Sequence, residues 1–222
     1  MNARSIRNKV LELSILVEDT NPDIILVTET WLDSNFENSF LCLDNFIIHR
    51  KDRAEGSDPH GGVMVCIRSD IHANIIEIDT YKEICFVNLI IKDFRIKVGV
   101  VYRPPSTNVS DSSDLTRIMR DQLQDCSSFV VFGDFNFPGI NWEYMTSSTS
   151  MERHFLEICD EIGVFQIIRE PTTQHFSVLD LCLCSSREIV TDVCIGECFS
   201  TSDHSIITYK IKIPRVRENK NL

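Results

Sequence analysis

The stretch FVVFGDFNFPGINW, residues 129–142, decides the fold because it joins an apolar run directly to polar groups. Residues 129–132 are all apolar, which is typical of a strand buried on both faces. Gly133 is expected to let the chain turn tightly as it leaves the sheet. With strand-like alternation, Asp134 and Asn136 point to the same side. The stretch therefore predicts a buried strand whose end presents a carboxylate beside an amide.

Length and composition fit one globular domain. The chain has 222 residues, of which 43% are hydrophobic and 25% charged, as in ordinary globular proteins. We expect one domain over residues 1–214 and a polar tail over 215–222. The net charge of −11 argues against a broadly basic nucleic-acid surface but leaves room for a local basic patch.

The nine cysteines are best interpreted as small buried hydrophobic residues. Their number is odd and no CxxC pair is present, so a disulfide framework or a zinc site is the weaker alternative. We therefore expect a reducing compartment, the nucleus or the cytoplasm. The N-terminus lacks the apolar core of a signal peptide, and no apolar run reaches ~18 residues, so neither secretion nor a membrane span is expected.

Apolar runs bounded by turn residues predict about ten strands and three helices. The strands are expected at 23–30, 46–52, 61–70, 74–79, in both arms of a hairpin over 83–105, and at 129–132, 164–168, 177–185, 191–199 and 205–213. The helices are expected from Ile6 to Val17, over 114–126 with Asp114 as N-cap, and over 151–163 with Gly163 at the end. The polar segment 53–62 is expected to be flexible. Because strands often follow strands, two packed sheets with helices outside fit better than βαβ alternation.

Several polar residues come directly after apolar strands. They are Glu29, Tyr102, Asp134 with Asn136, Asp180, and Asp203 with His204. Each alone has an ordinary structural explanation, such as a cap, a turn or a hydrogen-bonded core residue. If the strand ends converge, however, several carboxylates meet around one imidazole, and such a cluster repels itself unless a cation binds. Its hard oxygen ligands favour Mg²⁺ or Mn²⁺ over zinc, which points to metal-assisted phosphoester hydrolysis.

Five motifs, in this order and spacing, resemble the endonuclease/exonuclease/phosphatase (deoxyribonuclease I-like) superfamily. They are TETW (28–31), VYRPP (101–105), GDFNFPGINW (133–142), SVLDLCL (177–183) and SDHSII (202–207). More narrowly, they look like the apurinic-type endonuclease domain of non-LTR (LINE-type) retrotransposons. The resemblance covers nearly the whole chain. It implies an α/β (α+β) fold, a four-layer α-β-β-α sandwich of two stacked mixed sheets with the site at one edge.

The resemblance also implies metal ligands and a cofactor. Glu29 looks like the principal ligand, Asp203 is similar to a second acidic group near the metal, and Asn2 matches an asparagine of the family's first motif. The cofactor implied is Mg²⁺, with Mn²⁺ as an alternative. The partner implied is DNA, with no membrane, and the chain is expected to be a monomer.

Catalytic roles follow from the same resemblance. His204 resembles the catalytic histidine and Asp180 its orienting carboxylate, an arrangement that fixes the tautomer of the ring and raises its pKa. Asp134 looks like the residue that positions or deprotonates the attacking water. Asn136 and Tyr102 resemble polar contacts to the phosphate and the water.

Contacts to DNA are a further expectation. Arg103, Ser177 and Thr173 are candidate substrate-binding residues, and the basic run 49–53 could supply phosphate contacts or be a solvated loop. The loop at 136–148 carries Trp142 and Tyr144 and could contact DNA, but Trp142 is more often a core residue than a DNA contact.

Two departures from the family pattern matter. In the family a complete apolar strand precedes the asparagine matched by Asn2, whereas this chain begins at Met1, so we expect the first core strand to be missing. Its loss would expose neighbouring strand edges and could leave Asn2 unplaced. Arg4 stands where apurinic endonucleases carry a second acidic residue. In addition, no reverse transcriptase follows the domain.

Three functional hypotheses follow. The first is a Mg²⁺-dependent DNA endonuclease that nicks one strand and leaves a 3′-hydroxyl primer for target-primed reverse transcription. The second is an inactive remnant of a mobile element, which the missing strand favours and the intact site residues oppose. The third is a phosphoinositide or sphingomyelin phosphoesterase of the same superfamily, which the VYRPP and GDFNFPGINW motifs make the weaker alternative.

Overall fold

A computed structural model describes residues 1–53, 60–78 and 83–214 of the chain. Part of the segment expected to be flexible, residues 54–59, and the polar tail at 215–222 lie outside the described residues. None of the described helices is long and apolar enough to cross a membrane.

A six-stranded mixed sheet forms one half of the core. Its strands, in spatial order, are β10 (Phe165–Gln166), β11 (Asp180–Cys184), β7 (Phe129–Asp134), β6 (Phe94–Tyr102), β5 (Ile84–Ile91) and β4 (His72–Ile76). β6 and β7 run parallel, and the other neighbours are antiparallel. The stretch at 129–132 is thus a central strand, buried on both faces as its apolar run predicts.

The other half of the core is divided into two pieces. One piece is the antiparallel sheet β1 (Ile24–Thr28), β3 (Val63–Arg68) and β2 (Phe46–Lys51), and the other is the pair β12 (Val190–Cys198) and β13 (Ser205–Ile211). In the part of the chain that the structure describes, no strand joins β1 to β13. A short hairpin, β8 (Ile140–Asn141) and β9 (Thr146–Ser147), follows the central strand and was not predicted.

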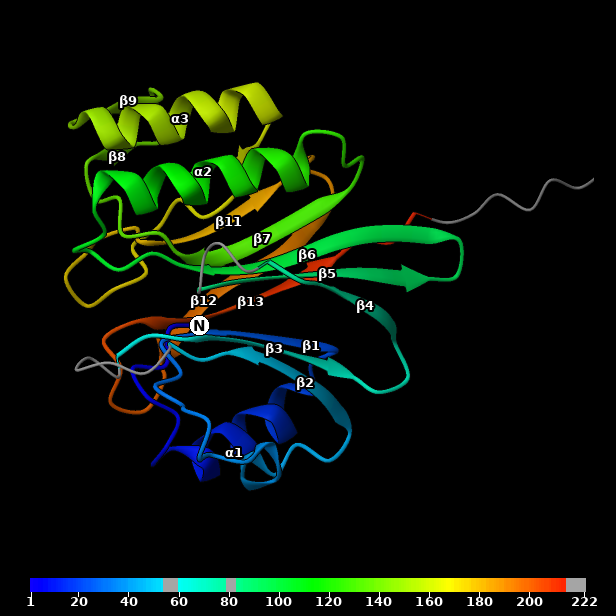
Figure 1. Cartoon of the computed structure of the whole chain (residues 1–222). Helices are drawn as coiled ribbons and strands as arrows, with labels where there is room; N and C mark the ends of the chain where they lie inside the picture. The colour runs from blue at the N-terminus through cyan, green and yellow to red at the C-terminus, as the bar shows by residue number, and fades with distance from the viewer. Residues whose placement is uncertain (54–59, 79–82, 215–222) are drawn as a thin grey trace, which may run out of the picture.

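The helices complete four layers, which confirms the predicted sandwich (Figure 1). α2 (Val109–Leu123) and α3 (Ser150–Ile162) cover the outer face of the six-stranded sheet, while α1 (Val10–Thr20) and the short 3₁₀ helix η1 (Asn38–Leu41) cover β1 and β3.

Because side chains alternate along the strands, the interior is divided into three apolar clusters: one between the two halves of the core, one under α2 and α3, and one under α1. Val130 and Phe132 pack between the two halves of the core, whereas Val131 of the same strand packs under α2 and α3. In β1, Leu26 faces the space between the sheets and Val27 faces α1. Both strands therefore contribute to two apolar layers, which explains their continuous apolar runs.

Two helices begin elsewhere than predicted. Ile6 lies in a turn that a hydrogen bond from the Lys9 N–H to the Ile6 carbonyl closes at 2.8 Å, and Lys9 itself has a non-helical φ of −130°, so the first helix begins at Val10. The second helix begins at Val109, because the side chain of Asn108 caps it, and Asp114 lies inside the helix. Gly163 ends α3 in a left-handed conformation, as predicted.

Gly133 does not form a turn. It lies within β7, and a β-carbon there would stand 1.9 Å from the carbonyl oxygen of Val101 in the parallel neighbour. The glycine therefore permits close approach of two backbones. The turn comes three residues later, where Asn136 has φ of 48°, so strand alternation does not set the direction of its side chain.

The N-terminal residues occupy the space beside the end of β1. Asn2 forms a parallel bridge with Thr28, and Ala3 donates its backbone N–H to the Thr28 carbonyl at 2.9 Å. Ser202, just before β13, donates its hydroxyl to the Asn2 carbonyl at 2.9 Å. Asn2 is fully buried, so the expectation that it could be left unplaced is wrong.

Candidate active site

Three neighbouring strands of the six-stranded sheet bring polar side chains to one edge. Register places Tyr102 of β6 opposite Asp134 of β7, and Asp134 opposite Asp180 of β11. β6 and β7 are parallel and end here, while β11 is antiparallel and begins here. The convergence that the sequence suggested therefore follows directly from strand order and register.

A buried imidazole is paired with one of these carboxylates. His204 lies just before β13, and its Nδ1 is 2.7 Å from Oδ2 of Asp180. Its Nε2 points the other way and is 3.9 Å from Oδ2 of Asp134. Burial by itself lowers the pKa of His204, but the hydrogen bond to Asp180 and the charges of Asp180 and Asp134 outweigh it and raise the pKa to about 9.

One amide group joins two carboxylates in the site. Nδ2 of Asn2 donates to Oε1 of Glu29 at 2.8 Å and to Oδ2 of Asp134 at 2.9 Å. Glu29 follows β1 with left-handed φ of 52°, and its Oε2 accepts from the indole of Trp31 at 3.0 Å. These donors are neutral, so they hold the two carboxylates close together without offsetting their charge.

Asp134 is the most deeply buried carboxylate of this pair. Burial first, and then the negative charge of Asp180, raises its pKa well above the ordinary value, while His204 and the amide of Asn2 act in the opposite direction. The cost of charging Asp134 is therefore high when no cation is near.

Tyr102 completes the wall of the site beside Glu29. Burial first, then the charges of Glu29 and Asp134, and a hydrogen bond to Glu29 all raise the pKa of its hydroxyl. The phenol therefore stays protonated and serves as a hydrogen-bond donor at neutral pH.

Asn136 and Arg103 hold the loop that follows the central strand. The Asn136 amide donates to the Arg103 carbonyl at 2.9 Å, and Nη1 of Arg103 donates to the Asn136 carbonyl at 3.1 Å. The guanidinium is buried and lies 4.2 Å from the centre of the Phe137 ring. This position favours support of the loop over the contact to DNA phosphate that we predicted for Arg103.

Asp203 lies at the rim, where Arg4 meets it. Its Oδ1 is 2.8 Å from Nη1 of Arg4 and 3.9 Å from Nε2 of His204. The cation at position 4, noted as a departure from the family pattern, thus pairs with a predicted metal ligand.

Thr173 and Ser177 lie in a tight loop next to the histidine. Thr173 forms a β-bridge with His204, and Ser177 donates its backbone N–H to the Thr173 hydroxyl at 3.2 Å. Both predicted substrate-binding residues are thus at the site. Phe176 between them is 86% exposed.

The basic run at 49–53 makes ion pairs within the protein. Arg50 pairs with Asp52 at 3.2 Å, and Arg53 pairs with Glu83 at 2.9 Å. Trp142 is buried and packs edge-to-face against Phe155, which confirms the core interpretation.

Sequence reasoning missed three residues that support the site. Ser202 binds both the carbonyl of Asn2 and the backbone N–H of His204. Trp31 orients Glu29, and Glu83 accepts a hydrogen bond from Gly62 at 2.9 Å beside Tyr102. Ser202 and Trp31 each stand within two residues of a predicted site residue, and that proximity is the signal that could have found them.

The donor set fits a hard divalent cation. Two buried carboxylates, Glu29 and Asp134, share one neutral amide, and Oδ1 of Asp180 has no hydrogen-bond partner among the described residues. Within the same described ranges, no three acidic, histidine or cysteine side chains form a ready metal cage. Mg²⁺ usually binds through one or two carboxylates plus waters and phosphate, so such a cage is not required.

Comparisons with known proteins bear on the family and the fold of the chain. The model of the endonuclease/exonuclease/phosphatase family matches residues 1–204. No curated protein sequence matches the chain. Similar solved structures include the endonuclease domain of TRAS1, a telomere-specific non-LTR retrotransposon, at 14% identity, 97% coverage of both chains and a TM-score of 0.71.

Two other nucleases share the fold. The 3′-5′ exonuclease NExo from Neisseria meningitidis is 18% identical, with 96% of this chain and 98% of that chain covered and a TM-score of 0.70. An AP endonuclease from Archaeoglobus fulgidus is 15% identical, with 96% and 97% covered and a TM-score of 0.69. At these identities the likeness shows a common fold.

Proposed function

Because the chain belongs to the endonuclease/exonuclease/phosphatase family, we propose that it is a divalent-metal-dependent DNA endonuclease that nicks one strand and leaves a 3′-hydroxyl. The observation that carries the proposal is the buried pair of His204 and Asp180, whose imidazole Nε2 faces Asp134 at 3.9 Å. A positioned imidazole beside a second carboxylate can hold a phosphate oxygen and a water on the same side of the sheet.

In this proposal the chain's own residues bind and orient the phosphodiester. The imidazolium of His204 donates through Nε2 to a phosphate oxygen, and Asp180 fixes the ring by accepting from Nδ1. Asp134 orients the attacking water and accepts its proton, for which its raised pKa is suited. The hydroxyl of Tyr102, in the same wall of the site, donates a hydrogen bond to Glu29.

The metal belongs beside Glu29. That carboxylate and the rim carboxylate Asp203 would hold Mg²⁺ or Mn²⁺, as the oxygen-rich donor set favours. Asn2, which we predicted as a ligand, turns its amide nitrogen toward Glu29 and its amide oxygen toward the Arg4 N–H at 3.1 Å, so it would orient the Glu29 ligand instead. When bound, the ion offsets the charge that develops on the phosphate.

Strand nicking for target-primed reverse transcription is the finer part of the proposal. It is supported by the family motifs and by the fold shared with the TRAS1 endonuclease domain. A reverse transcriptase would then extend the 3′-hydroxyl, and the site of action would be the nucleus or cytoplasm.

The test is cleavage of a supercoiled plasmid by the 222-residue chain. With Mg²⁺ we expect conversion to the nicked circle, no conversion with EDTA, and extension of the nick by a DNA polymerase, which requires a 3′-hydroxyl. A folded preparation that nicks nothing in Mg²⁺ or Mn²⁺ would contradict the proposal and favour the inactive remnant. Hydrolysis of a phosphoinositide without nicking would favour the other branch of the superfamily.

A further inference from the structure

The rim of the site contains an ion pair that the proposed mechanism does not use. Nη1 of Arg4 lies 2.8 Å from Oδ1 of Asp203, the carboxylate that we place beside the metal. The two side chains are 48% and 23% exposed, so both reach solvent. A divalent cation bound to the same oxygen would lie within ~5 Å of the guanidinium, a distance at which like charges repel each other strongly.

The geometry of this contact favours exchange of one cation for another. Although Nη1 of Arg4 is close, Oδ1 of Asp203 has no hydrogen-bond partner with proper geometry among the described residues. The pair is therefore held by charge and not by a directed bond. Because a divalent cation carries twice the charge of a guanidinium, it can replace Arg4 at this oxygen.

The backbone is fixed on both sides of the pair, which confines movement to the Arg4 side chain. The Arg4 N–H donates to Oδ1 of Asn2 at 3.1 Å, and the Arg4 carbonyl accepts from Nζ of Lys9 at 3.0 Å. The Asp203 carbonyl accepts from the Gln174 N–H at 2.9 Å. These contacts hold Arg4 in a left-handed conformation with φ of 42°, which costs energy in any residue other than glycine. From this fixed point the guanidinium can reach either Asp203 or solvent.

The other basic groups near Asp203 are too far away to replace Arg4. Nε2 of His204 lies 3.9 Å from Oδ1, and Nε2 of His175 lies 3.8 Å from Oδ2. Both distances exceed those of a hydrogen bond. Within the described part of the chain, Arg4 is thus the basic side chain closest to Asp203, and the carboxylate becomes available to a metal ion when Arg4 leaves.

We propose that Arg4 competes with the divalent cation for Asp203, so that the ion binds this carboxylate only as the guanidinium moves out to solvent. Arg4 thereby sets the affinity of the site for the metal. This inference rests on the proposed metal site at Glu29 and Asp203, and it adds a residue that weakens metal binding to the two that provide it.

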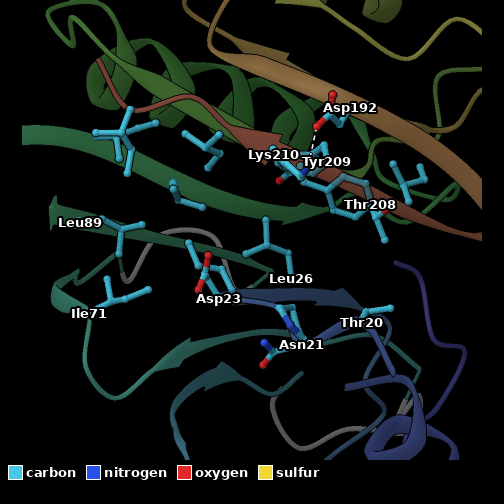
Figure 2. Close-up of a pocket in the computed structure, with 18 of the residues that line it drawn as sticks. Thr20, Asn21, Asp23, Leu26, Ile71, Leu89, Asp192, Thr208, Tyr209 and Lys210 are labelled. Carbon is cyan, nitrogen blue, oxygen red and sulfur yellow. Dashed lines mark ion pairs between the residues drawn. The ribbon is translucent and has the colours of Figure 1, made fainter. Parts of the chain in front are cut away.

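A second ion pair provides a matched control. At the other end of β13, Nζ of Lys210 lies 2.7 Å from Oδ2 of Asp192. Figure 2 shows this pair beside a cavity of about 660 Å³ between β1 and β13, which Met1 and Leu26 help to line. Lys210→Gln removes the same charge as Arg4→Gln, but away from the proposed metal ligands.

The test measures Mn²⁺ binding by electron paramagnetic resonance, which counts the free ion and does not depend on cleavage. Arg4→Gln should bind Mn²⁺ at least ~5-fold more tightly than the parent, because an exposed ion pair no longer opposes the ion. Arg4→Lys, which keeps the charge, should bind Mn²⁺ as the parent does, and so should Lys210→Gln. Added to Asp203→Asn, Arg4→Gln should give no further gain, because the competition requires the carboxylate.

Four results would overturn the proposal. They are equal Mn²⁺ affinity of the parent and Arg4→Gln, weaker binding in Arg4→Gln, an equal gain in Lys210→Gln, and a gain that persists in the Asp203→Asn background. Plasmid nicking by the parent distinguishes this failure from that of the proposed function. If the parent nicks and the affinities are equal, this inference alone is wrong. If neither protein binds Mn²⁺ and the parent nicks nothing, both are wrong.

Discussion

Each side chain in the site has few hydrogen-bond partners, so each substitution has a distinct consequence. Asn2 holds Glu29 and Asp134 through one amide nitrogen, and Asp180 holds His204 through a single contact of 2.7 Å. A group held by one bond is positioned by that bond, and loss of the partner leaves a buried polar atom unpaired. Function at this scale depends on these few contacts.

Replacing the imidazole should remove most of the activity and leave the fold intact. We expect His204→Ala to lower the plasmid-nicking rate by ~10²–10⁴, because a general acid–base or phosphate-binding group is lost. Since His204 lies at the start of β13 and at the edge of the core, near-UV circular dichroism should be unchanged.

The matched control is His154→Ala, in an exposed position on α3. It should nick at the parental rate. A parental rate in His204→Ala would show that the assigned role is wrong, and an equal loss in both variants would point to a general effect on folding.

The sequence anticipated which residues meet, but not what each of them contacts. The positions of Tyr102, Asp134 and Asp180 at strand ends were enough to predict that they lie together, since parallel and antiparallel register brings them to one edge. It could not predict the inward direction of Arg103, because that depends on the left-handed turn at Asn136. Single side-chain directions in loops follow from tertiary contacts, which periodicity does not contain.

At the scale of elements, helix boundaries depend on caps more than on periodicity. The apolar repeat that begins just after Asp114 predicts this residue as the N-cap of the second helix. The structure extends α2 back to Val109, where the Asn108 side chain accepts from the Asp111 backbone at 2.9 Å. The first turn of this helix is mostly polar and its one apolar residue, Val109, is exposed, so a hydrophobic pattern could not reveal it.

Asn108→Ala should therefore destabilise the protein, and Asp114→Ala should not. We expect the first to lower the free energy of unfolding by ~1 kcal/mol, the usual cost of losing an N-cap. Among the described residues, Asp114 forms an exposed ion pair with Arg117, so its loss should change stability by less than ~0.5 kcal/mol. Urea denaturation of both variants measures the difference, and equal effects would contradict the assigned cap.

The close approach of the parallel strands β6 and β7 leads to a second prediction at the scale of elements. Gly133→Ala places a methyl group against the Val101 carbonyl, 1.9 Å from its oxygen, and should cost ~3 kcal/mol or more because neither backbone can move freely. Gly196→Ala, in the outer strand β12, meets its nearest atom at 3.5 Å and should be nearly neutral. Thermal unfolding compares them, and a tolerated Gly133→Ala would show that β6 and β7 can separate.

At the scale of the whole molecule, one half of the core is a single sheet and the other is divided into two pieces. The six-stranded sheet is continuous, whereas β1-β3-β2 and β12-β13 share no strand pairing within the described residues and are linked by hydrogen bonds between the N-terminal residues and the loop before β13. The four layers were predictable because every buried strand shows an apolar run. The position of Met1–Ala3 was not, because three residues are too few for any periodic signal.

The buried amino group of Met1 makes the stability at this junction depend on pH. Burial lowers the pKa of the Met1 amine to about 5, against 8.0 for a free amine, although Asp180 and Asp134 oppose the shift. The unfolded chain therefore binds more protons than the folded chain between these values, so this group makes stability rise with pH from about 5 to about 8. The raised pKa of His204 acts in the opposite sense, because its stabilising effect is lost as pH rises toward 9.

N-terminal acetylation separates the two contributions. It removes the titrating amine but keeps an N–H that can donate to the Leu26 carbonyl, and the acetyl group extends into the cavity that Met1 lines. The stability of the free chain minus that of the acetylated chain should increase by about 2 kcal/mol between pH 6 and pH 8.5, since His204 is common to both. Urea denaturation at the two pH values measures this difference. A difference that does not change with pH would mean that the Met1 amine is solvated, and that the N-terminal residues do not close the junction between β1 and β13.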